Sequence, residues 1–258
     1  INLPYSSSDL MVRLRQMNPS SLQSLLDPPP MTPLLNEFMQ YHDRSGHLSF
    51  PVMYRMAMAG IIPKKFLALR KLSFVCPSCL FAQSRRRAWR TKAAPHQLRL
   101  PHHTKPGSCV ATDQVISAHP GLVPRMDGRH TRDRISCGSV FIDTTTGYSF
   151  THMQTSTDCE QTLLGKAMFE RNANSYNVVI HSYHANNDIF AEKAFTDQVR
   201  NDNQTITYCG VGAHHQNGIV ERKIRLLTRG SRTLLLNAQR CWKSAISTIL
   251  WPFAWRCF

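Results

Sequence analysis

The sequence predicts an α/β protein, with a mixed five-stranded sheet flanked by helices and a small, mostly helical metal-binding module in front of it. From Cys109 onward, apolar runs follow the order three strands, helix, strand, helix, strand, helix. Residues 41–82 carry His and Cys at intervals typical of metal ligands. The 258 residues suffice for one medium domain and one small domain.

The expected strands are short apolar segments bounded by turn residues. CVATDQVIS (109–117) is typical of a buried strand, and SVFIDTTTGYSFTHMQ (139–154) of a hairpin with its turn at 144–147. VVIHSYH (178–184) and TITYC (205–209) complete the sheet. Asp143 lies at the hairpin turn, so we interpret it as structural.

Three helices are expected between and after these strands. Thr157 opens the first, with Glu160 three residues later as a capping box, and the second covers 191–201. The last begins after Gly218. Its apolar stripe is Val220, Ile224, Leu227, Leu234 and Ala238. Glu221, Arg225 and Arg232 share the neighbouring face, which suits a metal-binding acid flanked by phosphate contacts or, equally, an ordinary solvated face with a Glu–Arg pair.

Four segments divide the chain. We expect a Ser- and Pro-rich flexible arm at 1–35, the metal-binding module at 36–92, a basic linker at 93–108 and the catalytic domain at 109–258. A short helical pattern starts near Pro33. The first residue is Ile1 and the last segment is apolar, so we expect a fragment that is truncated at its C-terminal end.

Composition points to a polyanionic partner. Lys and Arg number 31 against 16 Asp and Glu, for a net charge of +15 and a pI near 9.9. Nucleic acid fits this charge best, and a basic surface without a specific partner is the alternative. Eight dispersed cysteines indicate a reducing compartment, not a disulfide scaffold. No apolar run is long enough to cross a bilayer, so no membrane partner is expected.

The metal-binding hypothesis depends on two pairs of residues. His42 and His47 have four residues between them, and Cys76 and Cys79 form a Cys-x-x-Cys turn. Zinc takes four nitrogen or sulfur ligands in a tetrahedron, so these four side chains predict a closed, structural zinc site. The alternative is that the pairs are unrelated surface and packing residues. The remaining cysteines, Cys209 among them, look like packing residues next to apolar segments.

Several ordered motifs carry a resemblance to a known family. HDRSGH followed by CPSCLFAQSRRRAWR resembles the pre-integrase His-His-Cys-Cys module of copia-type retrotransposons. TDQVIS, FIDTTTGYSF, HSYHANNDIF and GVGAHHQNGIVERKIR are similar, in order, to segments of the integrase core that follows it. The resemblance covers roughly residues 37–256. It implies a ribonuclease H-like core, zinc on the four ligands, and catalytic Mg²⁺ or Mn²⁺.

The resemblance also implies a catalytic Asp–Asp–Glu set, here Asp113, Asn186 and Glu221. The family reads Asp-Asn-Gly at the second position, whereas this chain reads Asn186-Asn187-Asp188. An amide oxygen can touch a metal ion but does not neutralise its charge, so we expect impaired catalysis. The alternative is that Asp188 swings in as a surrogate ligand.

The expected partner is DNA, as element ends and as target. The residues predicted to contact it are Arg85, Arg86, Arg87, Arg90, His215, Asn217, Arg222, Arg225 and Arg232. For His215 and Asn217, helix capping and loop hydrogen bonds are an equally good interpretation. The resemblance also implies self-association and, for integration, a nuclear location.

The predicted function is DNA integration by metal-dependent attack of a 3′-hydroxyl on target DNA. Two rivals stand beside it: a nuclease acting on RNA–DNA hybrids, against which the zinc module argues, and a folded nucleic-acid-binding relic without catalytic activity, which Asn186 makes a serious candidate.

Overall fold

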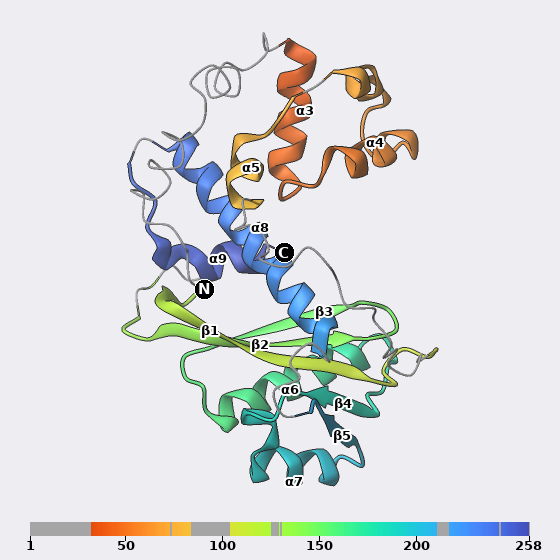
Figure 1. Ribbon diagram of the computed structural model, residues 1–258, viewed down its shortest axis with the longest axis vertical. Coiled ribbons are helices and arrows are strands. Elements are labelled where there is room, and N and C mark those ends of the chain that lie inside the picture. The colour runs from red at the N-terminus through yellow and green to blue at the C-terminus, as the bar shows by residue number, and fades with distance from the viewer. Residues whose placement is uncertain are drawn as a thin grey trace. The chain divides into compact units, whose positions relative to one another are not determined.

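The computed structural model describes residues 32–72, 74–83, 104–124, 129, 131–210, 217–242 and 244–257. They form two compact units (Figure 1). One unit takes its described residues from 104–228 and 248–256, and the other from 32–83, 229–247 and 257. Each is described by itself below.

The smaller unit is helical. It contains α3 (Pro33–Arg44), α4 (Phe50–Met58), the 3₁₀ helix η1 (Lys64–Lys71) and α5 (Pro77–Gln83). Thr32 caps α3, because its hydroxyl accepts a hydrogen bond from the Leu35 amide at 3.2 Å, and Pro33 supplies the favoured first helical residue. The α3, α4 and η1 helices bury Phe38, Met53 and Phe66 in one core.

The larger unit is built on a five-stranded sheet. Its strands are β1 (Val110–Leu122), β2 (Arg134–Asp143), β3 (Ser149–Gln154), β4 (Ser182–Ala185) and β5 (Thr205–Tyr208), in the spatial order β3-β2-β1-β4-β5. The β2 strand runs antiparallel to its neighbours β1 and β3, whereas β4 pairs parallel to β1 and β5 parallel to β4. The sheet is therefore mixed, with β1 at its centre.

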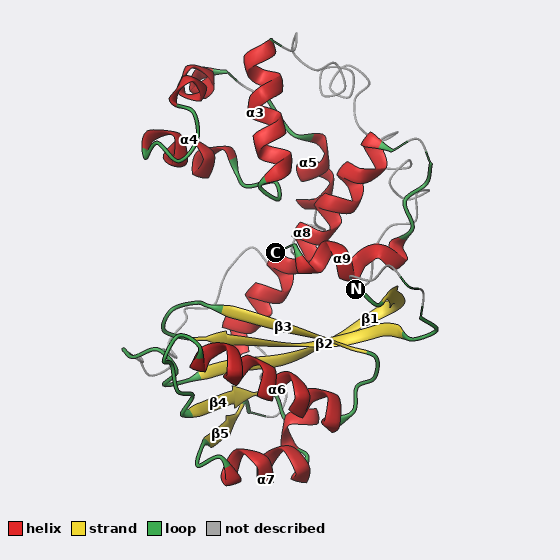
Figure 2. Ribbon diagram, turned by 180° about the vertical axis from the view of Figure 1, so that it is seen from behind, coloured by secondary structure: helices red, strands yellow, loops and turns green. Residues whose placement is uncertain are grey.

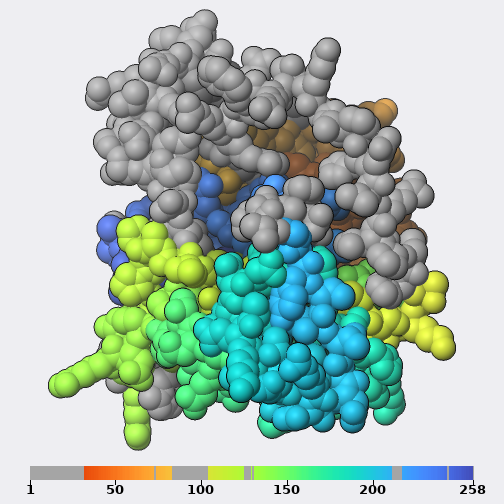
Figure 3. Space-filling model, turned by 60° about the horizontal axis from the view of Figure 1, so that its bottom comes forward, coloured from red at the N-terminus to blue at the C-terminus, as the bar shows by residue number. Residues whose placement is uncertain are grey.

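Helices cover both faces of this sheet. The α6 helix (Cys159–Asn174) lies across one face in Figure 2, and α7 (Lys193–Asn201) lies near β5. The 3₁₀ helix η2 (Ile189–Ala191) joins β4 to α7. Between helices and sheet, Phe141, Phe169, Tyr183, Phe190 and Phe195 form an aromatic core. Figure 3 shows a surface of this unit over which residues of α6 and α7 are spread.

The opposite face of the sheet receives the start of α8 (Gly218–Cys241), as Figures 1 and 2 agree. Residues of α8 up to Thr228 belong to the larger unit and those from Arg229 to the smaller one. The 3₁₀ helix η4 (Thr248–Leu250) and α9 (Trp251–Arg256) then pack on the long end of β1. There the Trp251 indole donates to the His119 carbonyl at 3.0 Å.

Close packing explains a glycine on this end of β1. An added Cβ at Gly121 would lie 2.3 Å from Pro252, so a side chain there would displace α9. Asp143 has the structural role expected of it. Its carboxylate accepts hydrogen bonds from the Gly107 amide at 3.0 Å and the Thr146 amide at 2.8 Å, and it is 4% exposed.

The expected fold class is confirmed: a mixed five-stranded, ribonuclease H-like α/β unit and a small, mostly helical unit with a His-His-Cys-Cys cluster. One local prediction is wrong, because α6 begins at Cys159 after Asp158, and that N-cap makes no side-chain cap hydrogen bond. The proposed boundaries at 35, 92 and 108 stay predictions, and residues 1–31 and 84–103 lie outside the described residues. No described helix has the length and apolarity needed to span a membrane.

Candidate functional site

The four predicted metal ligands come from two separate segments of the smaller unit. His42 lies in the last turn of α3, His47 follows in the turn after it, and Cys76 and Cys79 flank the start of α5. Gly46 and His47 have φ values of 69° and 60°, in the left-handed region. This reversal lets the His47 amide donate to the His42 carbonyl at 2.8 Å and returns the second imidazole toward the first.

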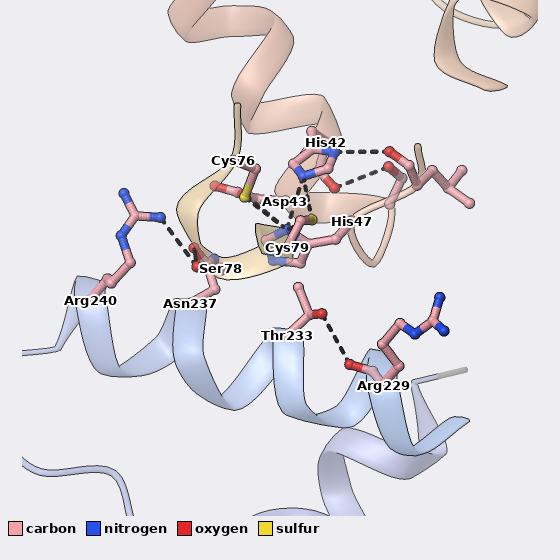
Figure 4. A network of polar contacts seen from close by, with 12 residues as sticks. His42, Asp43, His47, Cys76, Ser78, Cys79, Arg229, Thr233, Asn237 and Arg240 are labelled. Carbon is pink, nitrogen blue, oxygen red and sulfur yellow. Dashed lines mark hydrogen bonds and ion pairs between the residues drawn. The ribbon is translucent and has the colours of Figure 1, made fainter. Parts of the chain in front are cut away.

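The ligand atoms of these side chains converge on one point (Figure 4). All four lie within 4.8 Å of one another. His47 Nδ1 is 3.0 Å from His42 Nε2 and 3.6 Å from both Cys76 Sγ and Cys79 Sγ, and Cys79 Sγ is 3.3 Å from His42 Nε2. The structure thus brings together the four residues paired by sequence spacing.

This geometry fits a tetrahedral metal ion. Metal–nitrogen bonds of about 2.0 Å and metal–sulfur bonds of about 2.3 Å put neighbouring ligand atoms roughly 3.3–3.8 Å apart. His42 donates its other ring nitrogen, Nδ1, to the Leu48 carbonyl at 2.9 Å, which leaves the Nε2 lone pair for the ion. The hydrogen bond from Cys79 lowers the pKa of Cys76, which favours a thiolate at this position.

The second half of α8 supports the Cys-x-x-Cys turn (Figure 4). Ser78, between the two cysteines, is fully buried. Its hydroxyl accepts a hydrogen bond from the Arg240 guanidinium at 3.2 Å and lies 3.5 Å from the Asn237 amide oxygen. The metal-binding turn is therefore held by α8 as well as by its own ligands.

The predicted catalytic residues lie at one edge of the larger unit. Thr112 of β1 pairs with Ala185 of β4, so the next residues, Asp113 and Asn186, stand side by side. The Asn186 amide donates to Asp113 Oδ1 at 3.0 Å, and the Gln114 amide donates to the same oxygen at 2.9 Å. Glu221 lies in the first turn of α8, on the face of the sheet where α8 begins.

Charge and burial act together on Asp113. Burial raises the pKa of Asp113 to about 6, against the opposing hydrogen bonds from Gln114 and Asn186. The negative charges of Glu221 and Asp188 raise it further, so both carboxylates lie within electrostatic reach of Asp113. Negative charge is therefore concentrated at this edge, and the buried side chain at position 186 is a neutral amide.

Two amide oxygens near this edge are buried without a hydrogen-bond partner. They belong to Asn186, which is 7% exposed, and Asn217, which is 1% exposed. The Asn217 amide nitrogen donates to the Thr112 carbonyl at 2.9 Å, one residue before Asp113. This contact agrees with the interpretation that Asn217 forms loop hydrogen bonds. Because the side chain is buried and its amide nitrogen is engaged, little of it remains available to contact DNA.

The other residues predicted to bind DNA fall into two groups. On α8, Arg222 and Arg225 are exposed and Arg232 is partly exposed. The remainder, namely Arg85, Arg86, Arg87, Arg90 and His215, lie outside the described residues.

The sequence interpretation missed one pair of side chains. Cys209, which follows β5, was expected to be a packing residue, but its Sγ lies 3.4 Å from Nε2 of His184 on β4. Two signals were available in the sequence: His184 lies two residues before Asn186, and Cys209 directly follows the strand that is parallel to β4.

The fold and the site define a class: an α/β protein with a ribonuclease H-like sheet, an acidic edge at its central strands and a separate His-His-Cys-Cys cluster. No protein-family model and no curated protein matches the chain. Solved structures with similarity include a chain of the simian T-cell lymphotropic virus intasome in complex with PP2A regulatory subunit B56 gamma, at 12% identity and a TM-score of 0.42. The match covers 63% of this chain and 53% of that chain, so this chain spans about half of that one.

Two integrase cores are also similar. The HTLV-2 integrase catalytic core domain in complex with magnesium matches at 12% identity and a TM-score of 0.39, over 58% of this chain and 81% of that chain. The catalytic core domain of BIV integrase matches at 15% identity and a TM-score of 0.38, over 58% and 81%. The fold described above is established by the strand order and directions of the sheet itself.

Proposed function

We propose that the larger unit is an integrase-type polynucleotidyl transferase core of the copia retrotransposon type, with Asp113, Asn186 and Glu221 at its catalytic positions. The observation that supports this most is the contact between Asp113 and Asn186 at 3.0 Å, on adjacent parallel strands, with the charge of Glu221 in reach of Asp113. Strand transfer between nucleic acids needs oxygen ligands that converge in this way.

Zinc is the metal we propose for His42, His47, Cys76 and Cys79. Two nitrogen and two sulfur donors suit zinc better than a hard cation. The four ligands close the tetrahedron and leave no position for a water nucleophile, so the role of the ion is structural.

The acidic edge would hold Mg²⁺ or Mn²⁺. When bound, two such ions stabilise the charge on the attacking and leaving oxygens at phosphorus. Asp113 and Glu221 supply negatively charged oxygens for them. Asn186 supplies a neutral oxygen, and its amide nitrogen already donates to Asp113 Oδ1, so it competes with a cation for that oxygen. We therefore expect weak metal binding and slow chemistry.

Asp188 is the residue that could compensate. It is exposed, two residues beyond Asn186, and its charge reaches Asp113. It lies after β4 as the N-cap residue of η2, so it would reach Asp113 from the loop and not from the strand.

DNA is the partner we propose, as element ends and as target. The exposed guanidinium groups of Arg222 and Arg225 follow Glu221 on α8, and phosphate contacts there would hold a DNA strand near the acidic edge. Self-association and a nuclear location belong to the same proposal.

The test is a strand-transfer and nicking assay on a labelled DNA end with Mg²⁺ or Mn²⁺. Three proteins are compared: the natural chain, Asn186→Asp, and Asn186→Asp combined with Asp113→Asn. We expect the natural chain to be at least roughly 100-fold slower than Asn186→Asp, because a missing metal ligand removes charge stabilisation of about 3 kcal/mol in the transition state. The added Asp113→Asn change should abolish the gain.

The outcomes separate three hypotheses. Full activity of the natural chain would refute the role given to Asn186 and make Asp188 the next residue to change. A natural chain and an Asn186→Asp variant that both bind DNA yet stay inert would identify a nucleic-acid-binding relic, the candidate that the amide at position 186 favours. Cleavage of RNA–DNA hybrids alone would favour the nuclease rival.

A further inference from the structure

A thiol and an imidazole meet beside the acidic edge, outside the proposed catalytic set. Cys209 is 5% exposed, and its Sγ lies 3.4 Å from His184 Nε2. Two backbone contacts fix Cys209 in place: its amide donates to the Ala185 carbonyl at 3.0 Å, and its carbonyl accepts from the Asn187 side chain at 3.0 Å.

A hydrogen-bond chain determines which nitrogen of His184 faces the thiol as an acceptor. The Thr207 hydroxyl donates to the Tyr183 carbonyl at 3.3 Å, so toward His184 Nδ1, 2.9 Å away, it acts as an acceptor. In that arrangement Nδ1 carries the proton and Nε2 presents its lone pair to Cys209. An imidazole held in this way by a second partner is the arrangement found in metal-binding histidines.

The separation of the two side chains fits a shared metal ion. Three Cys–His ligand pairs of the His-His-Cys-Cys cluster lie between 3.3 and 3.6 Å apart, and the pair of Cys209 and His184 falls inside that range at 3.4 Å. Tetrahedral bonds of about 2.0 and 2.3 Å predict roughly 3.5 Å. The negative charges of Asp113 and Glu221 also act on the Cys209 thiol.

We propose that Cys209 and His184 form a second site for a thiophilic divalent cation, Zn²⁺ or Cd²⁺, at the edge of the sheet next to Asp113. The ion binds Cys209 Sγ and His184 Nε2 and completes its coordination with water. On binding, the thiol proton leaves to the buffer and a metal–sulfur bond forms, without oxidation or reduction. The site does not depend on the proposed transferase activity.

The test measures bound metal and the sulfur-to-cadmium charge-transfer absorbance of the full chain. The zinc-loaded protein is dialysed against low micromolar Cd²⁺, and total Zn and Cd per chain are measured by elemental analysis. We expect two equivalents for the natural chain and one for Cys209→Ser. The absorbance of Cys209→Ser should fall by roughly one third, because one of three metal-bound thiolates is removed. His184→Gln should also lose the second equivalent.

Matched controls identify each site. Cys137→Ser changes a buried thiol of the same unit that donates to the Ser156 carbonyl at 2.9 Å, and it should keep both equivalents. Cys79→Ser should lose the equivalent bound by the His-His-Cys-Cys cluster and keep the other. The proposal is wrong if the natural chain binds one equivalent, or if Cys209→Ser and His184→Gln keep two, because the contact is then only an S–H···N hydrogen bond. DNA takes no part in this measurement, so failure of the strand-transfer assay would leave its outcome unchanged.

Discussion

At the scale of single residues, the acidic edge depends on a neutral side chain in contact with a charged one. Asn186 donates to Asp113, which relieves part of the cost of burying that carboxylate. An aspartate at position 186 would place two carboxylates side by side, which is unfavourable until a cation binds between them. The amide therefore favours the metal-free protein at the expense of metal binding.

A pH-dependent stability follows from the buried Asp113. Its pKa rises from 3.8 to about 6 in the folded protein, mainly through burial. Because the folded state holds this proton more tightly than the unfolded state, the free energy of unfolding falls as pH rises through this window, and is level above it. Asp113→Asn removes the titration. The free energy of unfolding of Asp113→Asn, taken relative to that of the natural chain, should therefore increase by up to roughly 3 kcal/mol between about pH 4 and about pH 7.5.

Chemical denaturation of both proteins at the two pH values, without added divalent cations, measures this difference. Loss of the His-His-Cys-Cys metal at acid pH affects both proteins equally and cancels. A constant difference between the two proteins would mean that Asp113 keeps an ordinary pKa. Added Mg²⁺ should stabilise only the natural chain, and Asn186→Asp should respond more strongly than either.

Sequence spacing was sufficient to predict which residues meet at the His-His-Cys-Cys cluster. The intervals between His42, His47, Cys76 and Cys79 predicted a cluster that the structure contains. Other features depend on three-dimensional detail. The left-handed backbone of His47 follows from a tight turn, and the contact between His184 and Cys209 follows from the register of two parallel strands. No residue pattern marks the backbone of His47, and the two sequence signals for His184 and Cys209 do not specify that their side chains meet.

At the scale of elements, a buried lysine joins α6 to the C-terminal end of α7. Lys166 is 2% exposed and forms ion pairs with Glu170 at 3.0 Å and Asp202 at 2.5 Å. Its ammonium also lies 5.6 Å from the centre of the Tyr183 ring. Glu170 in turn accepts hydrogen bonds from the Tyr183 hydroxyl at 2.7 Å and the Gln204 amide at 2.6 Å.

Removing this charge should destabilise the larger unit. Lys166→Met keeps the length of the side chain but leaves Glu170 without its cation, which should cost about 3 kcal/mol of the free energy of unfolding. Adding Glu170→Gln should recover part of that loss, because the uncompensated charge is then removed. Lys193→Met, at an exposed lysine of α7, should change stability by less than about 0.5 kcal/mol.

Urea denaturation of the four proteins tests this network. Equal stability of Lys166→Met and Lys193→Met would contradict it.

The stability that this network provides also depends on pH. Burial works to raise the pKa of Asp202, but the hydrogen bonds from Lys166 and Gln198 outweigh it and the pKa is lowered. The stabilisation by the Asp202 carboxylate is therefore present above the ordinary carboxyl pKa and is lost as the pH falls below it.

The order of elements was predictable from periodicity, whereas several of their ends were not. The hairpin turn at 144–147 separates β2 from β3 as expected, and α8 begins at Gly218. The β1 strand, by contrast, continues to Leu122 through an irregularity between Ile116 and Gly121, because η4 and α9 pack on it. That extension depends on residues far away in sequence, such as Trp251, which lies 132 positions from its partner His119, so the local pattern does not contain it.

At the scale of the whole molecule, the net charge of +15 has a measurable consequence. If the basic surface contacts phosphates, binding releases counterions, and the logarithm of the association constant falls linearly with the logarithm of salt concentration. The slope counts phosphate contacts, so it can assign them to particular side chains.

Arg222 and Arg225 are the described residues best suited to this measurement, because both are exposed on α8 and neither belongs to the catalytic set. For duplex DNA, each contact that is lost should reduce the magnitude of the slope by about 0.9, so the double change to Ala should reduce it by roughly 1.8. Arg200→Ala is the control, since Arg200 is 77% exposed in the same unit but pairs with Asp197. Fluorescence anisotropy over a salt series gives all three slopes. If Arg200→Ala reduces the slope as much as the double change does, the positive charge acts as a diffuse field; an effect confined to Arg222 and Arg225 instead assigns the DNA path to α8, beside the acidic edge.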